Sequence, residues 1–100
     1  MAKLALVVRL VAKSGKEEEV AKFLAGALPL ANAEAFTSVW FALRTAPNTF
    51  YIVDAFADEA GRSAHRAGDI AKALMANAEA LLAEPPSIEK ADVIAAKIPG

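Results

Sequence analysis

The only histidine of the chain, His65, is the residue best suited to proton transfer. Its side chain has an ordinary pKa near neutrality, so it is the natural acceptor for a substrate proton. The alternative interpretation is a half-exposed helix histidine between Arg62, Arg66 and Asp69. The sequence alone identifies no partner that would orient the imidazole.

Asp54 is the second candidate, because a carboxylate inside an apolar strand is costly to bury unless it is paired. Arg44 is its expected partner across a hairpin, and Arg9 is the alternative, which would make a structural ion pair at a subunit interface. If Asp54 instead faces a pocket, it can orient His65 or hold a substrate hydroxyl group. Arg9, within an apolar run, is either an interface residue or a group that binds an anionic substrate.

Two aromatic residues are candidates for binding a flat ligand. Trp40 can stack on a ring and donate its indole N–H, and Phe56 offers an apolar surface without a polar group. Both are equally explained as packing residues of a core or an interface.

Several kinds of chemistry are poorly supported. The chain has no cysteine, so disulfides, thiolate nucleophiles and zinc–thiolate sites are excluded. It has no glycine-rich phosphate loop, no clustered metal ligands, and no serine beside a base. The net charge is −1 without a basic cluster, which argues against nucleic-acid binding. The sequence therefore argues against phosphoryl transfer and metallohydrolysis.

The first half of the chain predicts a strand, a helix and a connection. Residues 3–12 alternate with mostly apolar residues on both sides, so both faces of this strand are expected to be covered. Residues 14–17 resemble a capping box in which Ser14 caps a helix. Pro29 is expected to end or kink that helix, and residues 32–35 to form the connection.

The stretch 37–56 predicts a β-hairpin, with two aromatic-rich runs joined by residues 46–48. Pairing around this turn puts Trp40 and Asp54 on one face. The other face is more apolar and better suited to packing, and it includes Phe41 and Leu43. A slip of one residue would exchange the faces of one strand.

The remaining chain predicts two helices and a strand. Asp58 is expected to cap a helix ending near Gly68, and Asp69 to cap a second one that reaches about Glu84. Residues 87–98 have strand character.

This order of elements predicts an α+β fold of the ferredoxin-like, split βαβ kind, in a single domain of residues 1–100. Its four-stranded antiparallel sheet would carry helices on one face. The other face would meet a second copy of the chain in a homodimer. No membrane-spanning run is present, and the absence of cysteine fits a reduced, cytoplasmic setting.

The chain resembles the antibiotic-biosynthesis-monooxygenase-like (ABM) proteins. The resemblance rests on Gly15 after the first strand, the run FYIVDAFAD at residues 50–58, and the Ala64-His65 pair. Asp54 and Phe56 stand where the family usually has glutamate and tryptophan, and Val8 stands where haem-degrading relatives have asparagine. The second histidine common in the family would fall near Ile70.

The resemblance implies a dimeric α/β barrel with a pocket between sheet and helices in each subunit. It also implies an oxidoreductase that oxidises a small aromatic or quinol substrate with oxygen and without a cofactor. His65 would be the general base, with Trp40, Phe56, Asp54 and Arg9 as substrate-binding candidates. The alternatives are a non-catalytic ligand-binding or stress-associated barrel, and an isomerase of a small carbonyl compound.

Overall fold

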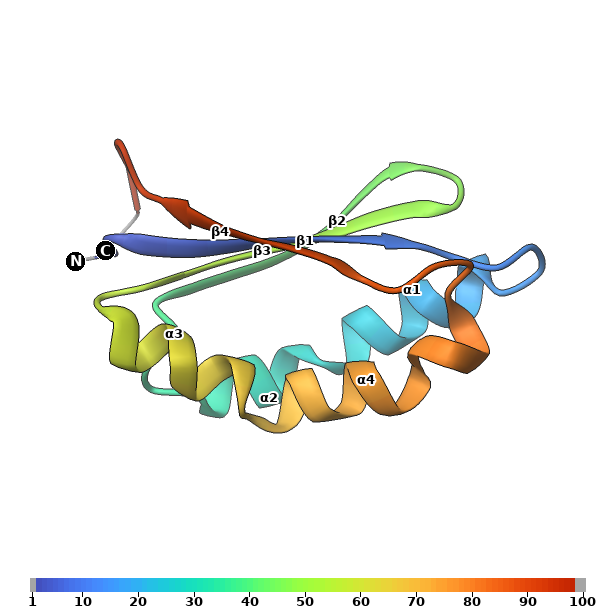
Figure 1. Cartoon of the computed structure of the whole chain (residues 1–100), viewed down its shortest axis with the longest axis horizontal. Helices are drawn as coiled ribbons and strands as arrows, with labels where there is room; N and C mark the ends of the chain where they lie inside the picture. The colour runs from blue at the N-terminus through green and yellow to red at the C-terminus, as the bar shows by residue number, and fades with distance from the viewer. Residues whose placement is uncertain (1, 99–100) are drawn as a thin grey trace.

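The computed structural model describes residues 2–98. Along the chain, strands and helices alternate as the sequence predicts, with each helical region divided in two (Figure 1). The elements are β1 (Leu4–Val11), α1 (Glu17–Gly26), α2 (Leu28–Ala33), β2 (Val39–Ala46), β3 (Thr49–Phe56), α3 (Glu59–Arg66), α4 (Asp69–Leu81) and β4 (Ser87–Asp92).

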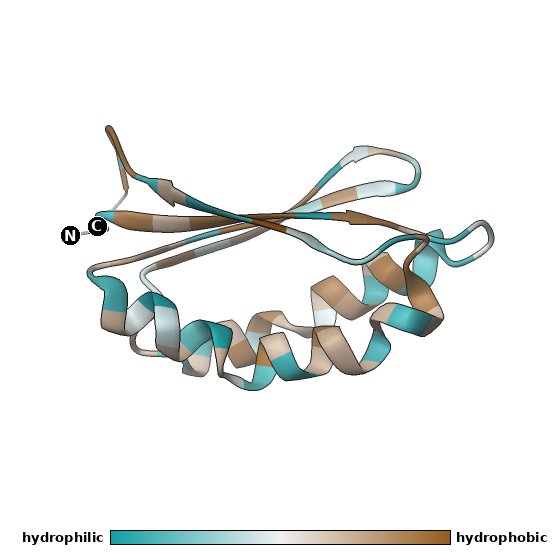
Figure 2. Ribbon diagram, in the orientation of Figure 1, coloured by the Kyte–Doolittle hydropathy of each residue, from teal (hydrophilic) through white to brown (hydrophobic). Residues whose placement is uncertain are grey.

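The strands form one antiparallel sheet in the order β2-β3-β1-β4. All of the helices lie on the same side of this sheet, and the opposite side is open (Figure 1). The ferredoxin-like α+β fold predicted from the sequence is confirmed. Apolar stretches run along the strands and over the helices (Figure 2).

The central strand β1 explains where the core lies. Leu6, Val8 and Leu10 face the helices and are buried, whereas Val7 and Arg9 point to the open side. Both faces of β1 were expected to be covered. The helix side is covered, whereas the open side is covered only at one end, where Ala5 is buried in a small cluster with Ala2 and Ala55. The core cluster joins β1, β3, α1 and α4; its members include Val20, Leu24, Phe50, Ile52 and Leu74.

The first helical region differs from the prediction at both ends. Lys16 precedes α1 without any side-chain cap in the described chain, so the predicted Ser14 cap is wrong. The Glu17 carboxylate instead accepts from the Gly15 backbone N–H, 2.9 Å away. The first helix ends at Gly26, two residues before the expected end at Leu28, and Pro29 lies in the first turn of a separate helix, α2, where its missing N–H costs little. This short helix occupies part of the expected connection.

The second helical region begins as predicted. The Asp58 carboxylate accepts from the Gly61 backbone N–H at 2.9 Å and caps α3. Asp69 is the first residue of α4 and does not cap it, because Gly68 occupies the capping position. The helix ends at Leu81, three residues before Glu84, as the chain turns to bridge Leu82 to Ala12.

The last strand is shorter than predicted. β4 ends at Asp92, because its neighbour β1 begins at Leu4, directly opposite. Ile94 beyond it is 99% exposed. Among residues 2–98, no helix is long and apolar enough to cross a membrane.

The hairpin has the predicted register, with Trp40 opposite Asp54 and Arg44 opposite Phe50. The packing roles of its faces are the reverse of the expectation. The face with Trp40 and Asp54 lies under the helices, and the more apolar face is open, with Phe41 56% and Leu43 46% exposed.

Candidate functional site

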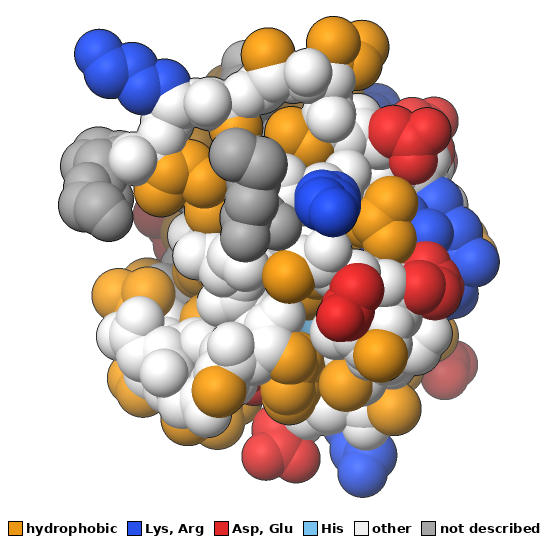
Figure 3. All heavy atoms as spheres, turned by 90° about the vertical axis from the view of Figure 1, so that its left-hand side faces the viewer, with side chains coloured by type: hydrophobic (Ala, Val, Ile, Leu, Met, Phe, Trp, Pro, Cys, Tyr) orange, Lys and Arg blue, Asp and Glu red, His pale blue; other side chains and the backbone are white. Residues whose placement is uncertain are grey.

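His65 lies on the side of α3 that faces the sheet, and it is 6% exposed. In a view of that end of the molecule, the pale-blue histidine is almost hidden (Figure 3). The interpretation of His65 as a half-exposed residue among surface charges is therefore wrong. Gly61, Arg62 and His65 are the buried residues of α3.

Both ring nitrogens of His65 contact carboxylates. Nε2 lies 2.8 Å from Asp54 Oδ2 on β3, and Nδ1 lies 2.7 Å from Glu34 Oε1 at the end of α2. We call Glu34, His65 and Asp54 the buried triad, since their side chains are 9%, 7% and 0% exposed. The sequence named Asp54 as one alternative partner for His65; the structure shows this contact and adds Glu34 as a second partner.

The protonation of His65 follows from these contacts. Burial alone lowers the pKa of His65, but the contacts with Asp54 and then Glu34 outweigh it and hold the pKa above the ordinary histidine value. The imidazole therefore keeps its proton to a higher pH than an ordinary histidine. Both of its nitrogens lie against carboxylates, so neither is free to face a substrate.

Glu34 was missed by the sequence analysis. It lies in the segment after α2, where no periodicity distinguishes a buried residue from an exposed one. Thr37 Oγ1 donates to Glu34 Oε1 at 2.7 Å, which fixes the carboxylate. The start of α4 also lies close to Glu34. A methyl group added at Gly68, which precedes this helix, would lie 2.9 Å from Glu34 Oε2. One sequence feature could have indicated the role of Glu34: it lies three residues before Thr37 in a turn, a spacing at which the two side chains can bond.

Asp54 does not pair with an arginine. Arg44 contacts Glu18 at 2.9 Å and Arg9 contacts Glu84 at 3.0 Å, so both predicted partners are wrong. The 2.8 Å contact of Asp54 with His65 is close but lies outside hydrogen-bond geometry. Within the described chain, neither Asp54 oxygen has a well-aligned donor. Oδ1 is therefore a buried acceptor without a donor.

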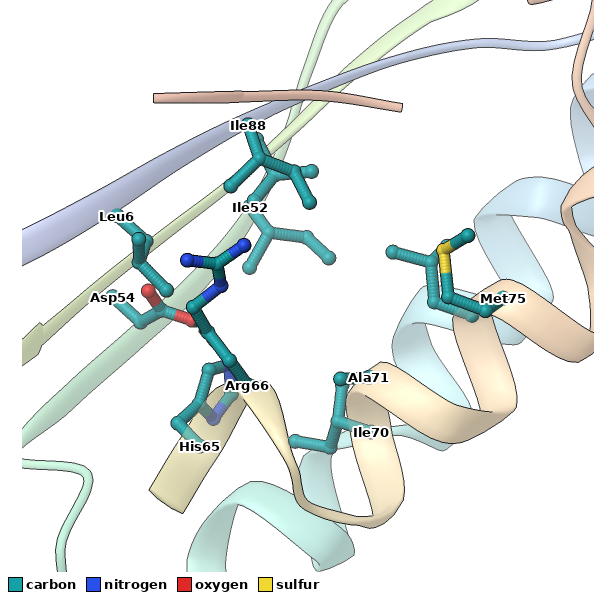
Figure 4. Close-up of a pocket in the computed structure, with 11 residues that line it drawn as sticks. Leu6, Ile52, Asp54, His65, Arg66, Ile70, Ala71, Met75 and Ile88 are labelled. Carbon is teal, nitrogen blue, oxygen red and sulfur yellow. Dashed lines mark ion pairs between the residues drawn. The ribbon is translucent and has the colours of Figure 1, made fainter. Parts of the chain in front are cut away.

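A cavity of about 280 Å³ opens between the sheet and the helices beside Asp54 and His65 (Figure 4). Its polar wall consists of Asp54, His65 and Arg66. The rest of the lining is apolar: Leu6, Val8, Ile52, Ile70, Ala71, Leu74, Met75 and Ile88. A small apolar cavity with a few converging polar groups is typical of a ligand site.

The other predicted site residues lie outside this cavity lining. Phe56 is fully buried, and its ring lies 5.2 Å from the His65 ring, so it supports the imidazole. Trp40 packs against the core, including Ile70, and its indole N–H is buried without a partner among residues 2–98. Arg9 points to the open side of the sheet, away from the buried triad.

A metal centre has no counterpart in the described residues. Within residues 2–98, no three His, Cys, Asp or Glu side chains are arranged to hold an ion.

No protein-family model and no curated protein matches the chain. A solved structure of a protein of unknown function from Nitrosomonas europaea is 63% identical, with a TM-score of 0.98. The match covers 100% of this chain and 97% of that one.

More distant structures share the fold. A second Nitrosomonas europaea protein, named provisionally as an antibiotic biosynthesis monooxygenase, is 16% identical with a TM-score of 0.82; 93% of this chain and 91% of that one are covered. A structure named as an antibiotic biosynthesis monooxygenase is 14% identical with a TM-score of 0.79, covering 92% and 99%. The chain therefore belongs to the same family as the Nitrosomonas europaea protein of unknown function, and it has the fold of the antibiotic biosynthesis monooxygenases.

Proposed function

We propose that the chain is a cofactor-independent monooxygenase that acts on a small aromatic or quinol substrate. The observation that carries the proposal is the apolar cavity with Asp54 and His65 in its wall. Such a cavity excludes water from a flat substrate and leaves one acceptor, Asp54 Oδ1, to take its acidic proton.

The two residues have different roles in this proposal. Both nitrogens of His65 are occupied, so the imidazolium acts through Asp54 by holding its carboxylate in place. Asp54 Oδ1 then accepts the substrate proton.

The oxidation itself draws its electrons from the substrate. For an anthrone-type compound, the deprotonated ring carbon bonds to O₂ and the O–O bond then breaks. One oxygen atom remains on that carbon as a carbonyl group. The other leaves as water with the two hydrogens that the carbon has lost, so two substrate electron pairs reduce O₂.

Oxygen uptake with hydroquinones and anthrone-type phenols tests the proposal. The wild-type chain is expected to consume oxygen faster than His65→Ala with at least one compound of the panel. Mass spectrometry with ¹⁸O₂ should find one labelled atom in the product. Equal rates for the two proteins across the panel would exclude the proposed chemistry.

A second candidate function is non-catalytic binding of a small ligand. It is favoured by the full occupation of the His65 nitrogens, which makes the buried triad a stable structural feature. A ligand that binds with micromolar affinity and is recovered unchanged in air would support this candidate over the first.

We infer that the protein forms a homodimer through the open side of the sheet. This side presents Phe41 and Leu43 with large exposed areas and half-buried Val7, Tyr51 and Val53. A continuous apolar surface of this kind is unfavourable in water and is typical of an interface. Two copies of the sheet, packed face to face, would cover it.

Phe41→Lys is expected to convert this dimer into a monomer, because it places a charge on the apolar surface at its most exposed aromatic residue. Light scattering should give a mass near the 10.5 kDa of one chain. Leu30→Lys, on the helix side, is the matched control and should remain a dimer. A wild-type protein that is monomeric at micromolar concentration would contradict the inference.

A further inference from the structure

We propose that the cavity binds a hydroxylated aromatic acid of one or two rings, whose hydroxyl group donates to Asp54 and whose carboxylate pairs with Arg66. This inference deepens the proposed function by naming a substrate class for the same cavity. It concerns binding, and it can be tested without turnover.

The volume of the cavity sets the number of rings. An apolar cavity of about 150 Å³ accommodates benzene, and this cavity measures about 280 Å³. Two fused rings therefore fit, whereas the four rings of a large polycyclic phenol exceed the space. The lining favours a flat apolar body, because it surrounds the ligand with aliphatic side chains.

The mouth of the cavity is also apolar and accessible. Met75 is 60% exposed and Ile88 is 43% exposed, although both line the cavity. They extend the apolar contact to the solvent boundary, from opposite sides of the opening (Figure 4). A ring that enters between them leaves one edge at the solvent.

Asp54 specifies the group at the inner end. Its Oδ1 is buried and lacks a donor within the described chain, and an unmet buried acceptor destabilises the folded protein. A ligand hydroxyl group supplies the missing donor. An ether or a carbonyl group at the same place would instead put a second acceptor against the carboxylate.

Arg66 specifies the group at the outer end. It has no carboxylate partner among residues 2–98, and its guanidinium reaches over the cavity (Figure 4). The other arginines each pair with an acid: Arg9 with Glu84, Arg44 with Glu18, and Arg62 with Glu59. A ligand carboxylate at the mouth keeps part of its hydration and gains a forked contact with Arg66.

Calorimetric titration of the whole chain with three probes tests the proposal. 6-Hydroxy-2-naphthoate has both groups, 6-methoxy-2-naphthoate lacks the hydroxyl donor, and 2-naphthol lacks the carboxylate. 6-Hydroxy-2-naphthoate is expected to bind about tenfold more tightly than either of the other two compounds, because each of them lacks one hydrogen bond to a charged group. Equal affinity for the hydroxy and methoxy acids would overturn the role of Asp54.

A pair of variants assigns the carboxylate contact. Arg66→Gln should remove the advantage of 6-hydroxy-2-naphthoate over 2-naphthol. Lys72→Gln, which removes an exposed cation from α4 outside the cavity lining, should preserve it. An unchanged advantage in Arg66→Gln, or an equal loss in Lys72→Gln, would overturn the role of Arg66.

The titrations are performed without oxygen, so that binding and chemistry are separated. The expected binding pattern without oxygen uptake in air would contradict the proposed monooxygenase and leave the ligand class supported. Oxygen uptake with phenols that show no such binding pattern would overturn the ligand class and leave the monooxygenase standing.

Discussion

Asp54→Asn is expected to slow oxygen uptake by about 10²–10⁴-fold, the usual contribution of a general base. The asparagine has nearly the same shape and still fills the fully buried position beside His65. It cannot accept a proton at neutral pH, however, so the substrate would remain protonated. The measurement is initial oxygen uptake at a saturating concentration of the best compound of the panel.

Asp92→Asn is the matched control for this variant. It removes a carboxylate from the exposed end of β4 and leaves the buried triad intact. Its rate should equal that of the wild-type chain. A folded Asp54→Asn protein with more than half of the wild-type rate would show that Asp54 does not accept the proton.

The fold could be predicted because its information lies in local periodicity. The alternation in β1, the turn between β2 and β3, and the cap at Asp58 are each encoded within a few residues. The errors lie at helix ends. There, close alternatives such as Lys16 for Ser14, or Gly68 for Asp69, differ by little in free energy.

The candidate site could be predicted only in part, because its contacts join distant parts of the chain. The sequence identified Asp54 and His65 by residue type. For an Asp54 that faces a pocket, contact with His65 was one alternative and contact with a substrate hydroxyl group was the other. Glu34 lies 31 positions before His65, in a segment without periodicity, so nothing in the sequence connects them. Spacing along a chain does not encode such a contact.

The choice of covered face failed for a physical reason. The apolar content of the Phe41 face indicated a core, and the charges near Trp40 indicated a surface. In the structure, Asp54 on the covered face is paired with His65 inside the buried triad, while the apolar face is left open. Hydropathy does not distinguish a core from a surface that meets another subunit.

His65→Ala is expected to destabilise the chain by about 3–5 kcal/mol, because removing one member of a buried ion cluster leaves the others unpaired. Glu34 and Asp54 would then face each other's charge across an empty space. Urea unfolding at pH 6 gives the free energy of unfolding. Adding Glu34→Gln and Asp54→Asn to His65→Ala should restore part of the loss, which simple removal of contacts would not do.

The same cluster makes the stability of the wild-type chain depend on pH. Because the pKa of His65 is higher in the folded state, its contribution is fully present below the unfolded value of about 6.5. The contribution is lost as the pH rises through the folded pKa, so the free energy of unfolding should fall as the pH rises above about 6.5. Glu34→Gln removes one of the carboxylates that raise this pKa, and should move the fall to lower pH.

Since His65 is the only histidine, its single set of imidazole NMR signals reports the titration directly. A wild-type stability that stays constant from pH 6 to 9 would mean that the buried triad does not hold His65 as a cation.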